Sequence, residues 1–217
     1  MLKKFLLDLL FPVECLGCRQ EGAWLCASCF KKLRFGAPAY ASSLAMPGLD
    51  KILMAGDYDD PLLAEAIKRF KYDLIIDLGP ILGRFLTLFW QGQTALPGTP
   101  GLISPLIIPL PLSKKRFRFR GFNQAEILAR ELSAALGYPL NRDLERIKHQ
   151  PPQAGLDADE RHKNIRGAFA WKGADLQGRD IILLDDVMTT GATLSEAALI
   201  LKTAGAGRIY GLVLAKG

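Results

Sequence analysis

The stretch Ile181-Ile-Leu-Leu-Asp-Asp-Val-Met-Thr-Thr-Gly-Ala-Thr193 is the most informative part of this 217-residue sequence. Its first four residues are apolar and predict a short strand that is buried on both faces. A turn and a helix that begins near Thr193 follow this strand. Strands that alternate with helices form parallel sheets, which bind ligands at the carboxyl ends of their strands. The two aspartates therefore stand where a ligand is expected.

The residues after this strand suit a phosphorylated ligand with hydroxyl groups. Asp185 and Asp186 repel each other unless they face a cation such as Mg²⁺ or accept hydrogen bonds from hydroxyls. A turn that leads into a helix offers backbone N–H groups to a phosphate, and Gly191 allows a close approach. The candidate site residues are Asp185, Asp186, Thr189, Thr190, Gly191, Ala192 and Thr193. The alternative is an ordinary acidic turn with Thr193 as a helix N-cap. A nucleotide-hydrolysing phosphate loop is not indicated, because the turn lacks Gly-Lys-Ser/Thr.

This segment resembles the phosphoribosyl-diphosphate motif of the type I phosphoribosyltransferases. That motif consists of an apolar strand, an acidic pair, two apolar residues and Thr-Thr-Gly-x-Thr. The resemblance implies that Asp185 and Asp186 contact the ribose 2′ and 3′ hydroxyls, directly or around Mg²⁺. It also implies that residues 189–193 cradle the 5′-phosphate and that the chain has the parallel-sheet α/β fold of that class.

The alternation of strands and helices continues outward from this segment. Apolar runs predict strands, and helical periodicity with capping residues predicts helices. The expected strands are 52–58, 106–112, 181–184 and 209–214, and the expected helices are 61–72, 78–90, 123–136 and 193–204. A linker rich in small residues and proline, 36–47, places a domain boundary near residue 45. We therefore expect an N-terminal module over residues 1–45 and a phosphoribosyltransferase-like domain over residues 46–217.

The N-terminal module contains all four cysteines of the chain, with the spacing Cys15-x2-Cys18-x7-Cys26-x2-Cys29. Two Cys-x-x-Cys knuckles at this spacing suit one tetrahedral Zn²⁺, and a closed four-thiolate site is structural. Two disulfides, a redox dithiol or an iron–sulfur cluster are the alternatives, of which disulfides are disfavoured in a reducing cytosol. The small core of this module is expected to contain Trp24, Phe30 and Leu33.

Composition and charge narrow the class of protein. The chain is 49% hydrophobic, which suffices for a buried core, and its 28 basic against 22 acidic residues give a net charge of +6. This charge favours anionic partners. The N-terminal segment 1–12 is expected to be an amphipathic helix rather than a signal peptide, because Asp8 interrupts its apolar run. No stretch has the ~18 apolar residues of a membrane span, so we expect a cytoplasmic protein without membrane insertion.

The stretch Ser113-Lys-Lys-Arg-Phe-Arg-Phe-Arg-Gly-Phe-Asn-Gln124 holds five cations and three phenylalanines and no acidic residue. One interpretation is a mobile loop that closes over the pyrophosphate of the donor, with charge supplied by Lys114, Lys115, Arg116, Arg118 and Arg120. Another is a strip for single-stranded DNA, in which Phe117 and Phe119 stack on bases. The third is an exposed basic turn with its phenylalanines packed below it and no ligand.

Nearly the whole sequence resembles the competence protein F family. The matching features are Leu-Leu-Phe-Pro at 9–12, the four-cysteine motif, Pro-Leu-Pro-Leu at 109–112, Arg-Gly-Phe-Asn-Gln-Ala at 120–125 and Gly-Ala-Phe at 167–169. The resemblance implies that the same cleft is lined by Arg146, Gln153, Arg161 and Asn164. Gln150 departs from the family, which often has threonine there.

Glutamine-dependent amide transfer is not expected, since no glutaminase domain fits in the chain. His149 and His162 are expected on the surface.

The family resemblance implies two kinds of function. Members are associated with natural transformation, in which they act on or with incoming single-stranded DNA and the DNA-uptake machinery. As an enzyme, the chain would transfer a phosphoribosyl group to an unknown acceptor and release pyrophosphate, in DNA uptake or in small-molecule metabolism. As a binding module, it would use the donor pocket as a sensor. The sequence does not identify the acceptor.

Overall fold

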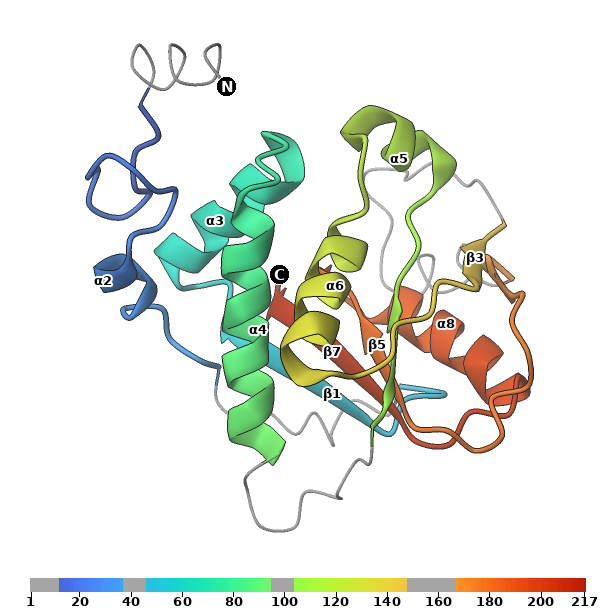
Figure 1. Cartoon of the computed structure of the whole chain (residues 1–217). Helices are drawn as coiled ribbons and strands as arrows, with labels where there is room; N and C mark the ends of the chain where they lie inside the picture. Colours follow the sequence, from blue (N-terminus) through green and yellow to red (C-terminus); the bar gives the residue numbers. More distant parts are fainter. Residues whose placement is uncertain (1–11, 37–45, 95–103, 148–166) are drawn as a thin grey trace.

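A computed structural model describes residues 12–36, 46–94, 104–147 and 167–217 (Figure 1). Several expectations lie outside the described residues. They are the N-terminal amphipathic helix, the domain boundary near residue 45, and the roles of His149, Gln150, Gln153, Arg161, His162 and Asn164.

A parallel β-sheet forms the centre of the molecule (Figure 1). Its strands are β1 (Lys51–Asp57), β2 (Leu106–Pro109), β5 (Ile181–Leu184) and β7 (Ile209–Lys216), in the order β1-β7-β5-β2. All neighbouring pairs in this order are parallel, and the short β6 (Val187–Met188) extends the sheet by pairing with the end of β7. The expected parallel sheet is confirmed, and β5 has the predicted bounds.

Helices cover both faces of this sheet. One face packs against α3 (Pro61–Tyr72), α4 (Leu78–Thr94) and α6 (Gln124–Leu136), and the other packs against α8 (Ala192–Thr203). Along β5, Ile182 and Leu184 join the first core and Ile181 and Leu183 join the second. Because both faces are buried, the strands are continuous apolar runs rather than alternating ones.

A small antiparallel hairpin lies beside α8 and was not predicted. It pairs β3 (Leu144–Arg146) with β4 (Phe169–Trp171). The N–H of Gly167 donates to Glu196 Oε1 of α8 at 2.6 Å, which ties the hairpin to that helix. Strands of three residues carry too little periodicity to be recognised in a sequence.

The basic stretch forms a helix, α5 (Lys114–Arg120), and the expectation of a loop there is wrong. Ser113 is its N-cap and accepts a hydrogen bond from the N–H of Arg116, and Gly121 ends it in the left-handed conformation with φ of 76°. Serine before a helix and glycine after it are standard stop signals. The unusual composition of the stretch concealed them.

The cysteine-containing module, with the short helix α2 (Ala27–Phe30), packs directly on the first helical layer. Leu25 and Leu33 are buried in the same core as Phe70 of α3, and Trp24 and Phe30 are partly buried against it. The module and the sheet therefore share one hydrophobic core. Among the described residues, no helix is long and apolar enough to cross a membrane.

Candidate functional site

The acidic pair lies at the carboxyl end of β5, where the sequence predicted a ligand site. The backbone N–H of Asp185 donates to Leu212 O at 3.0 Å, and the N–H of Leu214 donates to Asp186 O at 2.9 Å. Both aspartates are thus fixed between β5 and β7 by main-chain bonds. Asp186 is 7% exposed, whereas Asp185 is half-buried.

The two carboxylates stand in an unfavourable electrostatic environment. Burial among protein atoms raises the pKa of Asp185 to about 7, and the neighbouring Asp186 is the second cause. The backbone N–H of Asp186 and the cations Lys71 and Arg116 oppose this rise in pKa. A bound cation or a set of hydroxyl donors would offset the free-energy cost that remains for ionising Asp185.

A glycine turn connects the acidic pair to α8. Gly191 is the N-cap of α8, with φ of 77° and no side-chain hydrogen bond to the first turn, so the interpretation of Thr193 as N-cap is wrong. This positive φ favours glycine, and the end of the Met46 side chain lies where a Cβ atom would be. The hydroxyl of Thr190 reaches only its own turn, at 3.4 Å from Ala192 N. Thr189 is exposed and Thr193 half-buried. The turn can present backbone N–H groups to an anion.

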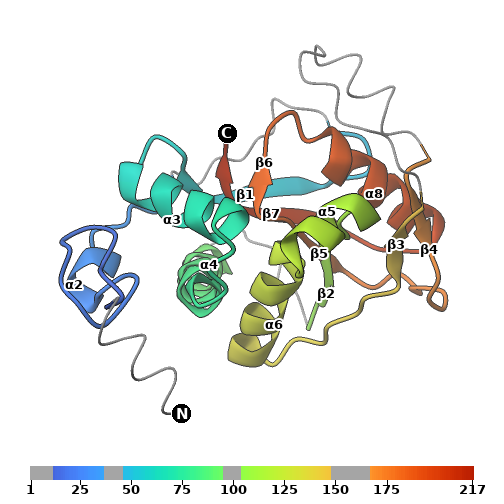
Figure 2. The same ribbon diagram turned by 90° about the horizontal axis from the view of Figure 1, so that it is seen from above.

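Two arginines from distant elements lie close enough to Asp185 to interact with it electrostatically. Arg146 of β3 has its guanidinium 5.5 Å from the centroid of the Phe169 ring, and its buried Nε has no hydrogen-bond partner among the described residues. Burial lowers the pKa of Arg146, Arg116 of α5 lowers it further, and Asp185 opposes both. Arg116, Arg146 and Asp185 therefore act on one another across a common space at the end of the sheet. Figure 2, viewed from above, shows α5 between α3 and the β3–β4 hairpin.

Helix α5 presents different residues on its two sides. Arg120 donates from Nη1 to Gln124 Oε1 at 3.0 Å, and its guanidinium lies 5.7 Å from the Tyr72 ring centroid. Arg116 precedes Arg120 by one helical turn and shares its side, toward the acidic pair. Lys114 and Arg118 form the matching pair on the opposite side. Arg116 is exposed, as are Lys114, Lys115 and Arg118.

The phenylalanines of α5 do not form the expected strip. Phe117 is 49% and Phe119 72% exposed. Two positions along an α-helix differ by about 200° in direction, so these rings point to nearly opposite sides. The two rings therefore do not share one face of the helix, and base stacking by Phe117 and Phe119 stays a prediction. Each ring remains available to a ligand on its own side.

Lys71 joins the site without any signal in the sequence. Its Nζ atom lies 3.1 Å from Asp186 Oδ1, and the two side chains are 16% and 9% exposed. Lys71 stands at the end of α3, 115 residues before Asp186. Its neighbours in the sequence form an ordinary basic helix end, and only the packing of α3 against the sheet identifies it.

The four cysteine sulfurs form one cluster, within 4.8 Å of one another. The Sγ atoms of Cys18 and Cys26 are 3.6 Å apart, which suits two ligands of a tetrahedral Zn²⁺. A Cβ atom at Gly17 would lie 2.8 Å from Cys29 Sγ, so glycine is required beside the cluster. Burial raises the pKa of the Cys29 thiol to about 12, so its thiolate form requires a bound cation. These residues fit a structural zinc ion.

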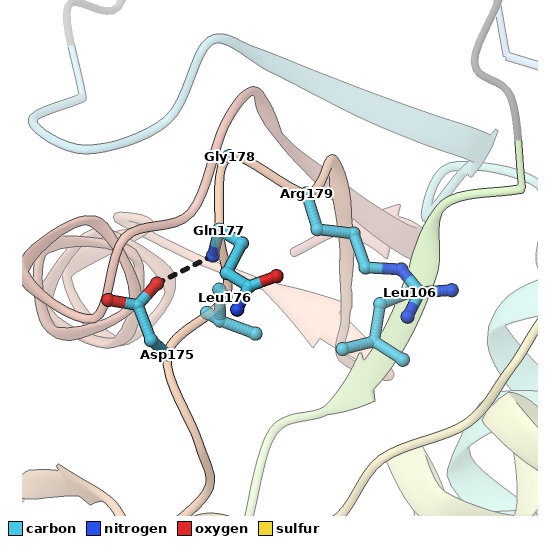
Figure 3. Close-up of a pocket in the computed structure, with 6 residues that line it drawn as sticks. All are labelled: Leu106, Asp175, Leu176, Gln177, Gly178 and Arg179. Carbon is cyan, nitrogen blue, oxygen red and sulfur yellow. Dashed lines mark hydrogen bonds between the residues drawn. The ribbon is translucent and has the colours of Figure 1, made fainter.

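A shallow depression with a volume of about 440 Å³ lies at the other end of the sheet (Figure 3). It is lined by Leu106, Asp175, Leu176, Gln177, Gly178 and Arg179. Asp175 Oδ1 already accepts the N–H of Gln177 at 2.7 Å. Ligands of parallel sheets bind at the carboxyl ends of the strands, and this depression lies at the amino ends of β2 and β5. We therefore assign the candidate site to the acidic pair.

Known proteins share both parts of this architecture. Residues 120–217 match the phosphoribosyl transferase domain family, and residues 6–57 match the double zinc ribbon domain family. The chain is 34% identical over 206 residues to competence protein F of Haemophilus influenzae, a match that covers 90% of this chain and 86% of that protein. The chain belongs to the competence protein F family.

Other relatives match this chain to different extents. The DNA utilization protein YhgH of Escherichia coli is 30% identical over 219 residues, which cover 91% of this chain and 94% of that protein. Competence protein ComFC of Bacillus subtilis is 39% identical over 100 residues, which cover 46% of this chain and 39% of that protein. The predicted family, its phosphoribosyltransferase-like domain and its four-cysteine zinc ribbon are confirmed.

Proposed function

We propose that this chain binds phosphoribosyl diphosphate together with Mg²⁺ in the cytoplasm and acts in DNA uptake. The observation that carries the proposal is the acidic pair at the carboxyl end of β5, followed by the uncapped first turn of α8 and faced by Arg116 and Arg146. The names of the relatives, competence protein F and DNA utilization protein, support the biological role.

Each part of the site has a role in donor binding. The backbone of residues 189–193 binds the 5′-phosphate, and the acidic pair accepts hydrogen bonds from the ribose hydroxyls. Asp185 and Asp186 would hold Mg²⁺, and the bound ion would neutralise charge on the donor and on the carboxylates. Arg116 and Arg146 bind the pyrophosphate, and the Nε of Arg146 has no other polar partner among the described residues.

This binding prepares the donor for transfer. In the transfer step an acceptor nucleophile forms a bond to ribose C1 while the bond from C1 to the pyrophosphate oxygen breaks with its electron pair. Negative charge then increases on the pyrophosphate, where Arg116 and Arg146 stabilise it more strongly than in the intact donor. The acceptor lies within reach of C1 on the side away from these arginines.

The direct test is a calorimetric titration of the zinc-loaded protein with phosphoribosyl diphosphate, with and without Mg²⁺. We expect binding that depends on Mg²⁺, and thermal stabilisation of about 2.7 kcal/mol at a donor concentration of about 100 times Kd. Asp185→Asn combined with Asp186→Asn should abolish both signals. Ribose 5-phosphate and pyrophosphate, titrated separately, report the two halves of the site. Absence of binding at millimolar donor would overturn the proposal.

A second function, binding of single-stranded DNA, is favoured by the exposed side of α5. Lys114, Lys115 and Arg118 form no ion pair among the described residues, and their charges can follow a phosphate backbone. Phe119, at 72% exposure, is the ring of this helix most accessible for stacking on a base. Lys114→Ala with Arg118→Ala should weaken binding of an oligonucleotide and reduce its salt dependence, whereas donor affinity should change little. Equal oligonucleotide affinity in this variant would reject α5 as the binding surface.

A further inference from the structure

We infer that Tyr72 and Arg120 are positioning residues for the proposed pyrophosphate site: their contact docks α5 against the end of α3 and so places Arg116 near Asp185. This inference rests on the proposed donor binding and adds two residues to it. Neither residue is assigned a contact with the donor here. Both act through the helix that carries Arg116.

Helix α5 is attached to the rest of the fold by few contacts. None of its side chains is buried, and a Cβ atom at Gly121, which follows the helix, would have no neighbour within 4 Å. Within the described part of the chain, Arg120 is the one α5 side chain that forms a hydrogen bond or a ring contact with another element. It is half-buried, whereas the other side chains of α5 are exposed. The partners of Arg120 therefore determine where this helix lies.

The first partner of Arg120 is a buried amide at the start of α6. Arg120 Nη1 donates to Gln124 Oε1 at 3.0 Å, and Gln124 is only 1% exposed. Asn123, the N-cap of α6, donates from Nδ2 to Leu110 O at 3.0 Å, which fixes the start of this helix to the chain that follows β2. An acceptor that is buried and fixed by its own neighbours holds a donor in a defined position.

The second partner of Arg120 is the ring at the end of α3. The guanidinium lies 5.7 Å from the centroid of the Tyr72 ring, within the range of a cation–π contact. Tyr72 is the last residue of α3 and is 58% exposed. Phe70, which is fully buried, packs its ring 5.7 Å from the ring of Phe122. The end of α3 and the chain that follows α5 are thus joined in the core, and Tyr72 extends this junction to Arg120.

Arg116 depends on this anchor for its position. It lies four residues before Arg120, about 6 Å along the helix axis and on the same side. Its side chain is exposed and forms no ion pair in the described part of the chain, yet it interacts electrostatically with Asp185 and Arg146. A cation without fixed partners of its own is preorganised only through the helix that carries it. Preorganised charge is what stabilises a leaving pyrophosphate.

Separate titrations of the zinc-loaded protein with pyrophosphate and with ribose 5-phosphate, both with Mg²⁺, test this inference. Tyr72→Leu removes the ring without changing any charge and should weaken pyrophosphate binding roughly threefold, as expected for loss of an exposed cation–π contact. Arg120→Met loses both contacts and one charge and should weaken it roughly tenfold. Affinity for ribose 5-phosphate should stay unchanged in both variants. Tyr72→Phe keeps the ring and should bind both ligands like the unmodified chain.

A mutant cycle with Arg116→Met shows whether Tyr72 acts through Arg116. In the Arg116→Met background, Tyr72→Leu should weaken pyrophosphate binding no further, because the cation that it positions is gone. Ile76→Ala, at an exposed apolar position shortly after α3, is the control and should change neither affinity. An effect of Tyr72→Leu that persists in this background, or equal losses for the two ligands, would overturn the inference.

Trypsin cleavage provides a measurement that does not need the donor. The five cations of α5 are cleavage sites, and a helix that loses its anchor opens more often. Tyr72→Leu should therefore be cut faster within α5 than the unmodified chain, whereas Tyr72→Phe and Ile76→Ala should not. Equal cleavage rates would show that Tyr72 does not dock α5. If Tyr72→Leu is cut faster but the unmodified chain binds neither half of the donor, the docking stands and the proposed function fails.

Discussion

Strand β5 has an aspartate beyond each end, and the two stand in opposite electrostatic environments. At the amino end, Asp180 accepts hydrogen bonds from the backbone N–H, Nε and Nη2 of Arg208, and the guanidinium bonds are the main cause of its lowered pKa. At the carboxyl end, burial raises the pKa of Asp185 to about 7. Only the four residues of β5 separate these two environments.

The two ends of the sheet therefore serve different purposes. At the amino end the charges are satisfied within the fold: Asp50 Oδ2, for example, accepts both the ammonium of Lys202 at 2.9 Å and the N–H of Ile209 at 2.7 Å. At the carboxyl end, Asp185 forms no ion pair and the buried Nε of Arg146 has no hydrogen-bond partner within the described part of the chain. Groups that the fold leaves unsatisfied cost stability and are available to a ligand.

The largest expected effect comes from a change in the zinc module, which lies away from both ends of the sheet. Cys29→Ser removes a buried zinc ligand and should lower the free energy of unfolding by several kcal/mol, of the order expected for loss of a structural metal. Because the module shares its core with α3, donor affinity should fall as well. Urea unfolding, zinc content and donor titration measure the three consequences. Lys32→Ala, at an exposed position of the same module, is the control. A stable, donor-binding Cys29→Ser protein without zinc would contradict the shared core.

The next largest effect should come from a change at the carboxyl end of the sheet, and it should lower the affinity for the donor without lowering stability. Asp185→Asn removes the carboxylate from its unfavourable position and should reduce donor affinity by at least ~100-fold, since a charged group in contact with the ligand is lost. The free energy of unfolding should stay the same or rise by up to about 1 kcal/mol, because repulsion from Asp186 disappears. Isothermal titration and urea unfolding of one preparation give both values. A clear loss of stability would remove the contrast between the two ends.

Asp180→Asn is the mirror experiment at the amino end. It should lower the free energy of unfolding by about 2 kcal/mol, because a partly buried carboxylate with two bonds to one guanidinium is lost. Donor affinity should be unchanged, since the residue lies at the far end of β5. Asp175→Asn, beside the shallow depression of Figure 3, provides a control at the same end of the sheet. Weaker donor binding by Asp180→Asn would show that the two ends are coupled.

Arg146→Met should reduce donor affinity by roughly tenfold, because one cation that faces the pyrophosphate is lost. The methionine keeps much of the packing on Phe169, and removal of a half-buried guanidinium whose Nε has no hydrogen-bond partner among the described residues should change the free energy of unfolding by less than about 0.5 kcal/mol. Arg142→Met, which breaks an exposed ion pair with Glu126, is the control. A matching loss of affinity in both variants would indicate a general charge effect instead.

The smallest effect is the pH dependence at the amino end. Asp180 has a folded pKa below its unfolded value of about 3.9, so its stabilising contribution is complete above that value and is lost as the pH falls through the folded pKa. The difference in free energy of unfolding between the unmodified chain and Asp180→Asn should therefore shrink below about pH 4. A difference that is constant from about pH 3 to about pH 7 would show that the ion pair contributes no charge-dependent stability.

Several features of the fold were predictable because they are encoded locally. The strand β5 and the helix α3 have the expected bounds, since an apolar run and a Pro61 helix start are signals within a few residues. Helix α5 carried equally local signals in Ser113 and Gly121, and it was missed because five cations in seven residues were taken for a loop. The β3–β4 hairpin was missed for a different reason. Its strands are defined by their pairing and not by a pattern of their own.

The sequence by itself determined the family, the parallel sheet, the acidic pair with its glycine turn and the four-cysteine site, since each depends on spacing along a short segment. Only the tertiary structure decided how the charges are shared. The pairing of Lys71 with Asp186 spans 115 residues, and the meeting of Arg116, Arg146 and Asp185 requires three elements to converge at one end of the sheet. The pKa of a carboxylate depends on burial and on neighbours in space, and neither can be read from the residues beside it in the chain.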